Sequence, residues 1–311
     1  MNRAALSPDG LGTVPTLVLG AKVYQVDLER MAVHVEDGRT FEGDLIVAAD
    51  GIRSDAGTSV FGRLPTVKTG FSAYRCMVPS KRLRDDPDTA PLLKCAKVLM
   101  IVHPERRIVI YPCSSWDTMN FVCIFPDGRD RRQQWNKGAS TEEMVETFGD
   151  FHPAVVKMLS MAEDTGVWQL RGRDPLSTLV KGHFCLIGDA AHAMGPHQGQ
   201  GACQAIEGAE ALRVVLKGAE LSDIEERLLI YDELRVERVR RVIENTRKMG
   251  PKNREYSQYS VAFSDYHWSY SMTPEAIRLM NQPGIKMECA DAATGQLVVL
   301  EGNDLGNGSL N

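Results

Sequence analysis

The segment GHFCLIGDAAHAMGPHQGQGACQAIEGAEAL, residues 182–212, decides the fold of this chain. A short apolar run from His183 to Ile187 predicts a buried strand that ends at Gly188-Asp189. A loop rich in Gly and Pro follows, and Gly199-Gln200-Gly201 then opens a helical pattern. A helix that begins without capping side chains offers free backbone N–H groups and the positive end of its dipole to an electron-rich ligand. The segment therefore predicts a strand, a loop and a ligand-binding helix start, with Asp189 placed to accept hydrogen bonds from ligand hydroxyls.

A second stretch, MAVHVEDGRTFEGDLIVAADGIRS at residues 31–54, has a related design. Alternating apolar residues lead into the hairpin signal Asp37-Gly38, and a buried strand over residues 45–49 then ends in Asp50-Gly51. A glycine there lets the backbone approach a ligand closely. By itself Asp50-Gly51 is equally an ordinary turn after a strand. Its order and spacing relative to the first segment favour a ligand-binding turn.

The two stretches together resemble the FAD-binding motifs of the flavin-dependent aromatic hydroxylases, the monooxygenases that include salicylate and para-hydroxybenzoate hydroxylase. GDAAHAMGPHQGQG at residues 188–201 is similar to the family's second motif nearly residue for residue. One departure follows, because Glu207-Gly208-Ala209 stands where the family usually has Glu-Asp-Ala. The resemblance covers most of residues 1–250. It implies an α/β fold: a Rossmann-like, three-layer FAD/NAD(P)-binding domain, N-terminally truncated, with an antiparallel β-sheet substrate domain.

The resemblance also implies an activity, which is hydroxylation of a small aromatic substrate (phenolic, salicylate-like or a secondary metabolite) with molecular oxygen. FAD is the implied cofactor and NAD(P)H the implied co-substrate. Asp55-Ala56-Gly57-Thr58 replaces the family's usual basic continuation after the Asp-Gly turn, which weakens the case for a nicotinamide contact there. The implied cofactor-binding residues are Asp50, Gly51, Arg53, Gly188, Asp189, Ala190, Pro196, Gly199, Gln200 and Gly201.

The family's opening GxGxxG turn has no counterpart in this sequence. Gly10-Leu11-Gly12 supplies two glycines, but Pro15 stands in place of the third and no apolar strand precedes them. We therefore expect the first dinucleotide-binding unit to be missing, including a strand expected between the strands that carry Asp50 and Asp189. Two alternatives stay open: a redox-silent paralogue that acts as a non-oxidative scaffold, cyclase-like or interaction protein, and an incomplete gene model of an ordinary hydroxylase.

Composition narrows the class of protein. The 311 residues carry a net charge of −5 and a pI near 5.9, which argues against a nucleic-acid partner. No apolar run reaches the roughly 20 residues of a membrane span, and no signal peptide is seen, so we expect a cytoplasmic protein. Seven scattered cysteines without a C-x-x-C pair predict reduced thiols and no metal site. The sequence leaves the oligomeric state open.

The pattern along the chain predicts a domain division. Residues 1–68 and 182–250 form the incomplete FAD-binding domain, 69–181 a substrate-binding β-sheet domain, and 251–311 an irregular tail with one short helix near 274–280. Sheet strands are expected at 71–78, 97–102, 107–111, 119–125 and 167–170, a loop at 129–137, and short helices at 141–148 and 153–161. The helix from Gln200 is expected to bury Ala202, Ile206, Ala209, Leu212 and Leu216.

A long helix is expected from a Ser222 cap to about Lys248. Its many arginines favour a solvated face, with a Glu237–Arg241 pair one turn apart.

The catalytic residues remain unknown, with three weak candidates. His197 follows the flavin loop and either faces substrate or lies at the surface. Arg75 either holds an acidic substrate or forms a cross-strand ion pair, and Tyr111 either lines the pocket or packs in the core. His192, inside the motif, is interpreted as a structural histidine rather than an acid–base group.

Overall fold

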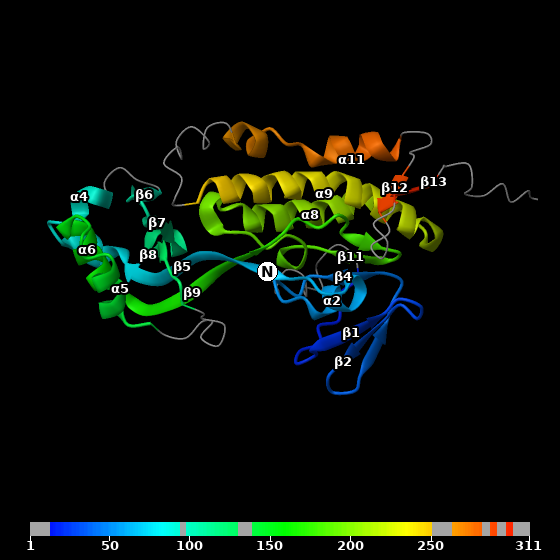
Figure 1. The fold of residues 1–311 in the computed structure, drawn as a ribbon, viewed down its shortest axis with the longest axis horizontal. Coiled ribbons are helices and arrows are strands. Elements are labelled where there is room, and N and C mark those ends of the chain that lie inside the picture. The colour runs from blue at the N-terminus through cyan, green and yellow to red at the C-terminus, as the bar shows by residue number, and fades with distance from the viewer. Residues whose placement is uncertain are drawn as a thin grey trace, which may run out of the picture.

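The computed structural model describes residues 13–93, 98–129, 139–250 and 263–281, with the backbone of 287–290 and 297–300. The molecule is elongated, and two long strands run between its halves (Figure 1). One half holds a five-stranded sheet with short helices, and the other holds a stack of longer helices over small sheets. The predicted division into an FAD-binding domain, a substrate domain and a tail stays a prediction.

The five-stranded sheet is antiparallel, as expected. Its order is β6-β7-β8-β5-β9, and the long strand β5 pairs with β8 on one side and β9 on the other. The strands are β5 (Thr66–Pro79), β6 (Leu99–Val102), β7 (Arg107–Cys113), β8 (Thr118–Pro126) and β9 (Glu163–Arg173). Helices α5 (Thr141–Thr147) and α6 (Pro153–Ser160) cover one face and bury Phe148 and Met158 against it. Two further helices, α3 (Ser80–Asp85) and α4 (Ala90–Leu93), were not predicted. The predicted loop at 129–137 lies almost entirely outside the described residues.

The strands that carry the two motifs lie side by side. β4 (Ile46–Ala48) and β11 (Phe184–Leu186) are parallel neighbours, and β10 (Val180–Lys181) follows in the order β10-β11-β4. The two strands pair directly, so the structure shows no gap at the position where the missing strand was expected. The backbones of the two strands and their flanking residues are hydrogen-bonded directly to each other. The Ile46 N–H donates to the His183 carbonyl and the Ile187 N–H donates to the Ala48 carbonyl, both at 3.0 Å. β4 therefore ends this sheet within the described part of the chain.

The N-terminal region forms a small meander next to β4. β1 (Val23–Asp27), β2 (Ala32–Val35) and β3 (Thr40–Glu42) make an antiparallel sheet, and Gly38 adopts φ 89° in the predicted turn. Helix α2 (Asp55–Phe61) packs on β1, where the Val26 N–H donates to the Ser59 hydroxyl at 2.9 Å.

Three helices form the layer above the β4–β11 sheet: α8 (Gln200–Val215), α9 (Ile224–Lys248) and α11 (Met272–Met280) (Figure 1). The predicted inward face of α8 is wrong for Ile206, which is 69% exposed, and for Ala202 and Ala209, which are also exposed. Leu212 is buried as predicted, and the helix also buries Gln204, Gly208, Ala211, Val214 and Val215. Polar anchoring explains the rotation: Glu207 and Gln204 turn toward α9, where arginines bind them.

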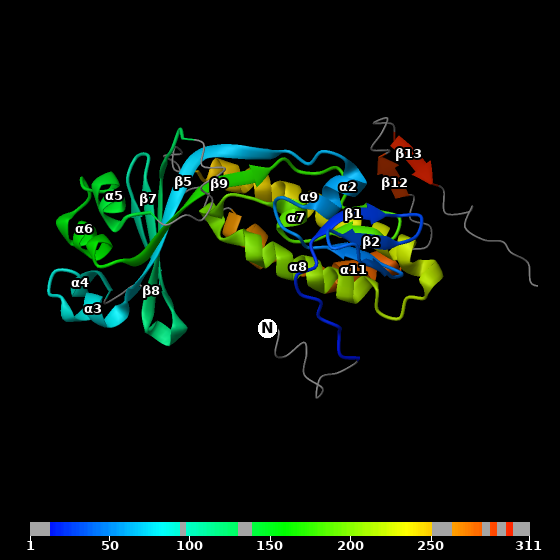
Figure 2. The same ribbon diagram turned by 90° about the horizontal axis from the view of Figure 1, so that it is seen from below.

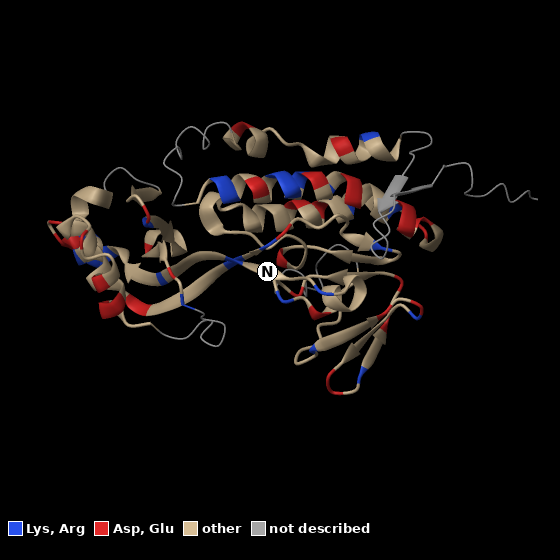
Figure 3. Ribbon diagram, viewed as in Figure 1, with Lys and Arg blue, Asp and Glu red and all other residues tan. Residues whose placement is uncertain are grey.

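Two arginines of α9, Arg235 and Arg238, are buried rather than solvated, which corrects the sequence prediction for them, whereas Arg241 and Arg247 are exposed as predicted. Arg235 and Arg238 side chains are 1% and 3% exposed, and both donate to the Glu207 carboxylate, at 2.7 and 2.8 Å. Arg238 also stacks on Tyr270, 3.8 Å from the ring centroid. Basic and acidic residues alternate along α9 (Figure 3).

An ion pair and the N-terminal cap of α9 also differ from the prediction. Glu237 pairs with Arg240 at 3.3 Å instead of Arg241, whose guanidinium lies over Tyr266. The cap is not Ser222: Glu220 and Asp223 form a reciprocal capping box around the 3-10 turn Leu221–Asp223.

The C-terminal part is more regular than predicted. The expected short helix is α11, but β12 (Met287–Ala290) and β13 (Leu297–Leu300) also pair antiparallel. No helix in the described ranges combines the length and the apolar character needed to cross a membrane. Viewed from below, β5 and β9 lead from the helical layer to the sheet half (Figure 2).

Candidate functional site

The loop after β11 is a sharp turn into a short helix. Gly188 has φ 59°, a conformation that favours glycine, and α7 (Asp189–His192) begins directly after it. Asp189 stays exposed as a residue, yet neighbouring atoms crowd its carboxyl and burial raises its pKa. Ala190 is fully buried, so its side chain packs in the core and only its backbone is left for a ligand.

The start of α8 is open, as the sequence predicts. The 3-10 turn Pro196–Gln198 leads into Gly199, which caps the helix with φ 65° and no side-chain hydrogen bond. A Cβ built on Gly199 or Gly201 meets no atom within 4 Å. The first backbone N–H groups of α8 therefore face open space, together with the positive end of the helix dipole.

A cavity of about 640 Å³ lies between this helix start and the five-stranded sheet. It brings together six of the residues singled out in the sequence, which are Arg75, Tyr111, Pro196, His197, Gly199 and Gln200. Its apolar walls come from β6, β7 and β8 and include Val98, Val109, Val122 and Ile124. The volume lies within the range of small-molecule sites, roughly 300–1,000 Å³. This space is named the large cavity below.

The three catalytic candidates all line the large cavity. Tyr111 is partly exposed, so its alternative as a core residue is wrong. Arg75 places its guanidinium 5.5 Å from the ring centroid of Trp168, on the neighbouring strand β9. The structure therefore shows a cation–π contact for Arg75, for which the sequence predicted a cross-strand ion pair as one alternative.

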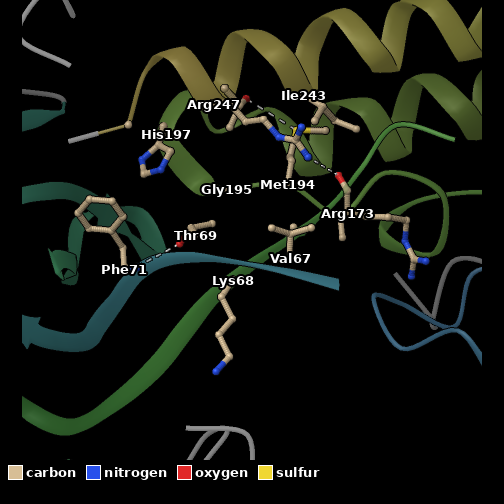
Figure 4. Close-up of a pocket in the computed structure, with 14 residues that line it drawn as sticks. Val67, Lys68, Thr69, Phe71, Arg173, Met194, Gly195, His197, Ile243 and Arg247 are labelled. Atoms are coloured by element: carbon tan, nitrogen blue, oxygen red, sulfur yellow. Dashed lines mark hydrogen bonds between the residues drawn. The ribbon is translucent and has the colours of Figure 1, made fainter. Parts of the chain in front are cut away.

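His197 lies between the large cavity and a smaller one of about 280 Å³. Figure 4 shows the smaller cavity, with Val67 and Thr69 of β5 on one side and His197 and Met194 above them. Burial, with a smaller contribution from the nearby Arg107, lowers the pKa of His197 to about 4. The imidazole is therefore neutral at pH 7, and the alternative of a surface histidine is wrong.

The Asp-Gly turn after β4 does not reach the large cavity. Asp50 accepts from the Ser54 hydroxyl and, at 3.0 Å, from the Ala56 N–H, so its carboxylate holds the start of α2. Gly51 adopts φ 82°, and the exposed Arg53 lines a separate cavity. The structure thus separates Asp50, Gly51 and Arg53 from the residues around the α8 start.

Two buried arginines were missed by the sequence reasoning. Arg107 lines the large cavity and donates to the Met249 carbonyl at 3.2 Å. Arg173, 2% exposed at the end of β9, donates to the Ile52 carbonyl at 2.6 Å. Its Nε and Nη1 atoms are buried with no hydrogen-bond partner among the described residues. Desolvation lowers the pKa of Arg173, and Asp50 partly offsets this effect. The sequence signal was the run Arg171-Gly172-Arg173, which extends the predicted strand beyond Leu170.

Comparison with known proteins places these features in context. Residues 24–246 match a family described as FAD binding domain. The chain is 35% identical over 252 residues to hispidin-3-hydroxylase from Neonothopanus nambi, a match that spans 76% of this chain and 60% of the relative. It is 30% identical over 222 residues to 6-hydroxynicotinate 3-monooxygenase from Bordetella bronchiseptica, spanning 70% and 55%. A solved salicylate hydroxylase in complex with substrate superposes with a TM-score of 0.75 at 28% identity, covering 88% of this chain and 73% of that one. The chain thus spans less than two thirds of the length of these two curated relatives.

Proposed function

The chain belongs to the family of FAD-dependent aromatic hydroxylases that carry this FAD binding domain, and from that premise we propose that it hydroxylates a small aromatic substrate with NAD(P)H and molecular oxygen. The observation that carries the proposal is the large cavity. It joins an uncapped helix start to an apolar wall and two cationic side chains in one space. That combination suits a flat, electron-rich ring on one side and an aromatic substrate on the other.

The residues around the α8 start fit a flavin ring. Among the described residues, no atom lies within 4 Å of a Cβ built on Gly199 or Gly201, so a ring can approach the backbone closely. The N–H groups there would hold an electron-rich edge of the ring, and preorganised donors of this kind are each worth about 3 kcal/mol when water is excluded. Asp189, the first residue of α7 after β11, would accept from a hydroxyl of the ribityl chain. Pro196 stiffens the loop beside the ring.

When bound, FAD supplies the redox and oxygen chemistry. The protein's own part is to orient the substrate and exclude water. The apolar wall formed by β6, β7 and β8 excludes water from the ring, while Arg75 and Arg107 favour a substrate that bears a phenolate or carboxylate. Tyr111 supplies a hydroxyl on the same wall. His197 is neutral at pH 7 and suits a hydrogen bond to the ring or substrate.

The names of the relatives agree with an aromatic substrate. Hispidin, 6-hydroxynicotinate and salicylate are the compounds named for similar proteins. An acceptor of comparable size fits a cavity of this volume beside a flavin ring.

The test is cofactor content. Purified protein reconstituted with FAD should be yellow, and Asp189→Ala should retain markedly less flavin after gel filtration. Asp85→Ala, which removes an exposed carboxylate on α3 in the sheet half, is the matched control and should retain as much flavin as the native chain. With FAD bound, an aromatic acceptor should accelerate NAD(P)H oxidation.

A folded, colourless protein that takes up no FAD contradicts the proposal and favours a redox-silent scaffold. Equal flavin retention by Asp189→Ala and the native chain contradicts the placement of the cofactor.

A further inference from the structure

A helical segment outside the family match closes one side of the large cavity. Residues 263–268 are helical and lie beyond residues 24–246, which match the family. In Figure 1 this segment is the orange helix that precedes α11, above the α8–α9 layer. Ser264, His267 and Trp268 line the large cavity. Their i, i+3, i+4 spacing places them on one face of the helix, so the segment presents that face to the cavity.

The opposite side of the segment is anchored to α9. Arg238 donates to the Tyr266 carbonyl at 3.0 Å, and its guanidinium lies 4.8 Å from the Tyr266 ring centroid. The same guanidinium stacks on Tyr270 at 3.8 Å. Because Glu207 in turn binds Arg238, the buried ion pairs of the helical layer hold the residues on both sides of His267. The position of His267 is therefore set by the packing of α8 and α9.

The imidazole of His267 is buried without a hydrogen-bond partner. Neither ring nitrogen has one among the described residues. A neutral imidazole carries one donor and one acceptor, and leaving them unpaired when buried costs free energy. Burial and then Arg238 lower the pKa of His267, whereas Glu207 opposes them, so the neutral ring is the form present at pH 7. A hydroxyl group in the large cavity satisfies the ring.

The polar groups of the large cavity come from three directions. His197 belongs to the loop before the α8 start, Arg75 to the sheet, and His267 to the helical segment. Trp268 is 86% exposed although it lines the cavity, so its ring is available at the rim. An exposed aromatic ring beside a buried hydrogen-bonding group suits a ligand that is itself aromatic and hydroxylated.

We propose that His267 recognises a phenolic hydroxyl of the aromatic substrate, accepting its hydrogen bond, while Trp268 packs on the substrate ring. The inference rests on the proposed function and narrows its substrate class to hydroxylated aromatic acids, since Arg75 favours a carboxylate on the same molecule. A site built to pair a hydroxyl discriminates strongly against an analogue that lacks it, because its own buried polar group is then left unpaired.

The experiment is a calorimetric titration with two pairs of aromatic acids. The pairs are 4-hydroxybenzoate with benzoate, and 4-hydroxycinnamate with cinnamate. Each titration is run on the full chain as purified and after incubation with FAD. The native chain should bind at least one hydroxylated acid roughly tenfold more tightly than its parent acid, as expected for one buried hydrogen bond.

Variants of His267 assign that preference to its ring. His267→Leu should weaken the hydroxylated acid about tenfold and leave the parent acid unchanged, whereas His267→Gln, whose amide also accepts a hydrogen bond, should keep part of the preference. His34→Leu, the same substitution on β2, is the matched control and should change neither affinity. His267→Leu removes two unpaired buried nitrogens, so its urea midpoint should be no lower than that of the native chain.

Three results overturn the inference: no binding of either hydroxylated acid, equal affinity of the native chain for both members of each pair, or equal losses for both members in His267→Leu. Equal losses with a lower urea midpoint would make His267 a structural residue. Failure of the proposed function is separable. A chain that takes up FAD but shows no preference for the hydroxyl refutes this inference alone, whereas a preference lost in His267→Leu without FAD uptake supports it and refutes the flavin assignment.

Discussion

His192 should make the native chain lose stability on mild acidification. The side chain is 2% exposed, and burial together with Arg235 lowers its pKa from 6.5 to about 4. The unfolded chain therefore binds the proton first as the pH falls. The stability that the neutral imidazole confers is present above pH 6.5 and is lost progressively as the pH approaches 4. Between pH 7 and pH 5 the loss amounts to roughly 2 kcal/mol, from linkage with these two pKa values.

The assay compares urea unfolding of the native chain and His192→Gln at pH 7 and pH 5. Carboxylates titrate in both proteins, so their contribution cancels in the difference. Whatever glutamine costs at pH 7, the difference should move by about 2 kcal/mol in favour of the variant at pH 5. A difference that stays constant between the two pH values refutes the reasoning, and an acid–base role for a neutral histidine at this position would then be open again.

Further predictions concern the helical layer and the large cavity. Glu207→Gln leaves Arg235 and Arg238 uncompensated and should lower the free energy of unfolding by about 3–5 kcal/mol, whereas Glu210→Gln on the exposed side of α8 should hardly shift the urea midpoint. Burial would raise the pKa of Glu207, but hydrogen bonds from Arg238 and Arg235 outweigh it and lower the pKa, so the network's stability should be lost as the pH falls through that lowered pKa. Tyr231→Phe removes the 2.9 Å bond to the Leu186 carbonyl and should cost about 1 kcal/mol, measured by urea unfolding. Arg75→Ala should raise KM for a carboxylate-bearing aromatic acceptor far more than for its uncharged analogue, and equal effects on both would argue against charge recognition.

The sequence predicted the elements that follow from local pattern. The strands β5 to β9 and the uncapped start of α8 appear where alternating apolar residues and glycines place them. The family resemblance singled out Arg75, Tyr111, His197 and the α8 start, and in the structure they line one cavity. These features depend on residues that lie close together in the chain or belong to one family pattern.

The predictions that were wrong concern polar groups that are buried by contacts between residues far apart in the chain. Arg235 and Arg238 were assigned to a solvated face because isolated arginines are rarely buried, and only the position of Glu207 on α8 reveals their pairing. The same ion pairs set the rotation of α8, which leaves Ile206 exposed. The register that pairs β5 with β9 joins strands about a hundred residues apart in the chain, so no local pattern specifies it.

The most direct test of the central claim is an FAD titration of Gly201→Ala against Gly208→Ala. Both substitutions lie on α8 and gain helix propensity, and a Cβ at Gly201 meets nothing within 4 Å while one at Gly208 makes only an ordinary 3.6 Å contact. Neither variant should lose fold stability, but Gly201→Ala should bind FAD at least about tenfold more weakly, because its methyl group occupies space needed by the ring. Gly208→Ala should bind FAD like the native chain. Equal FAD affinity for all three proteins would contradict the claim that the glycine-lined start of α8 receives the flavin ring.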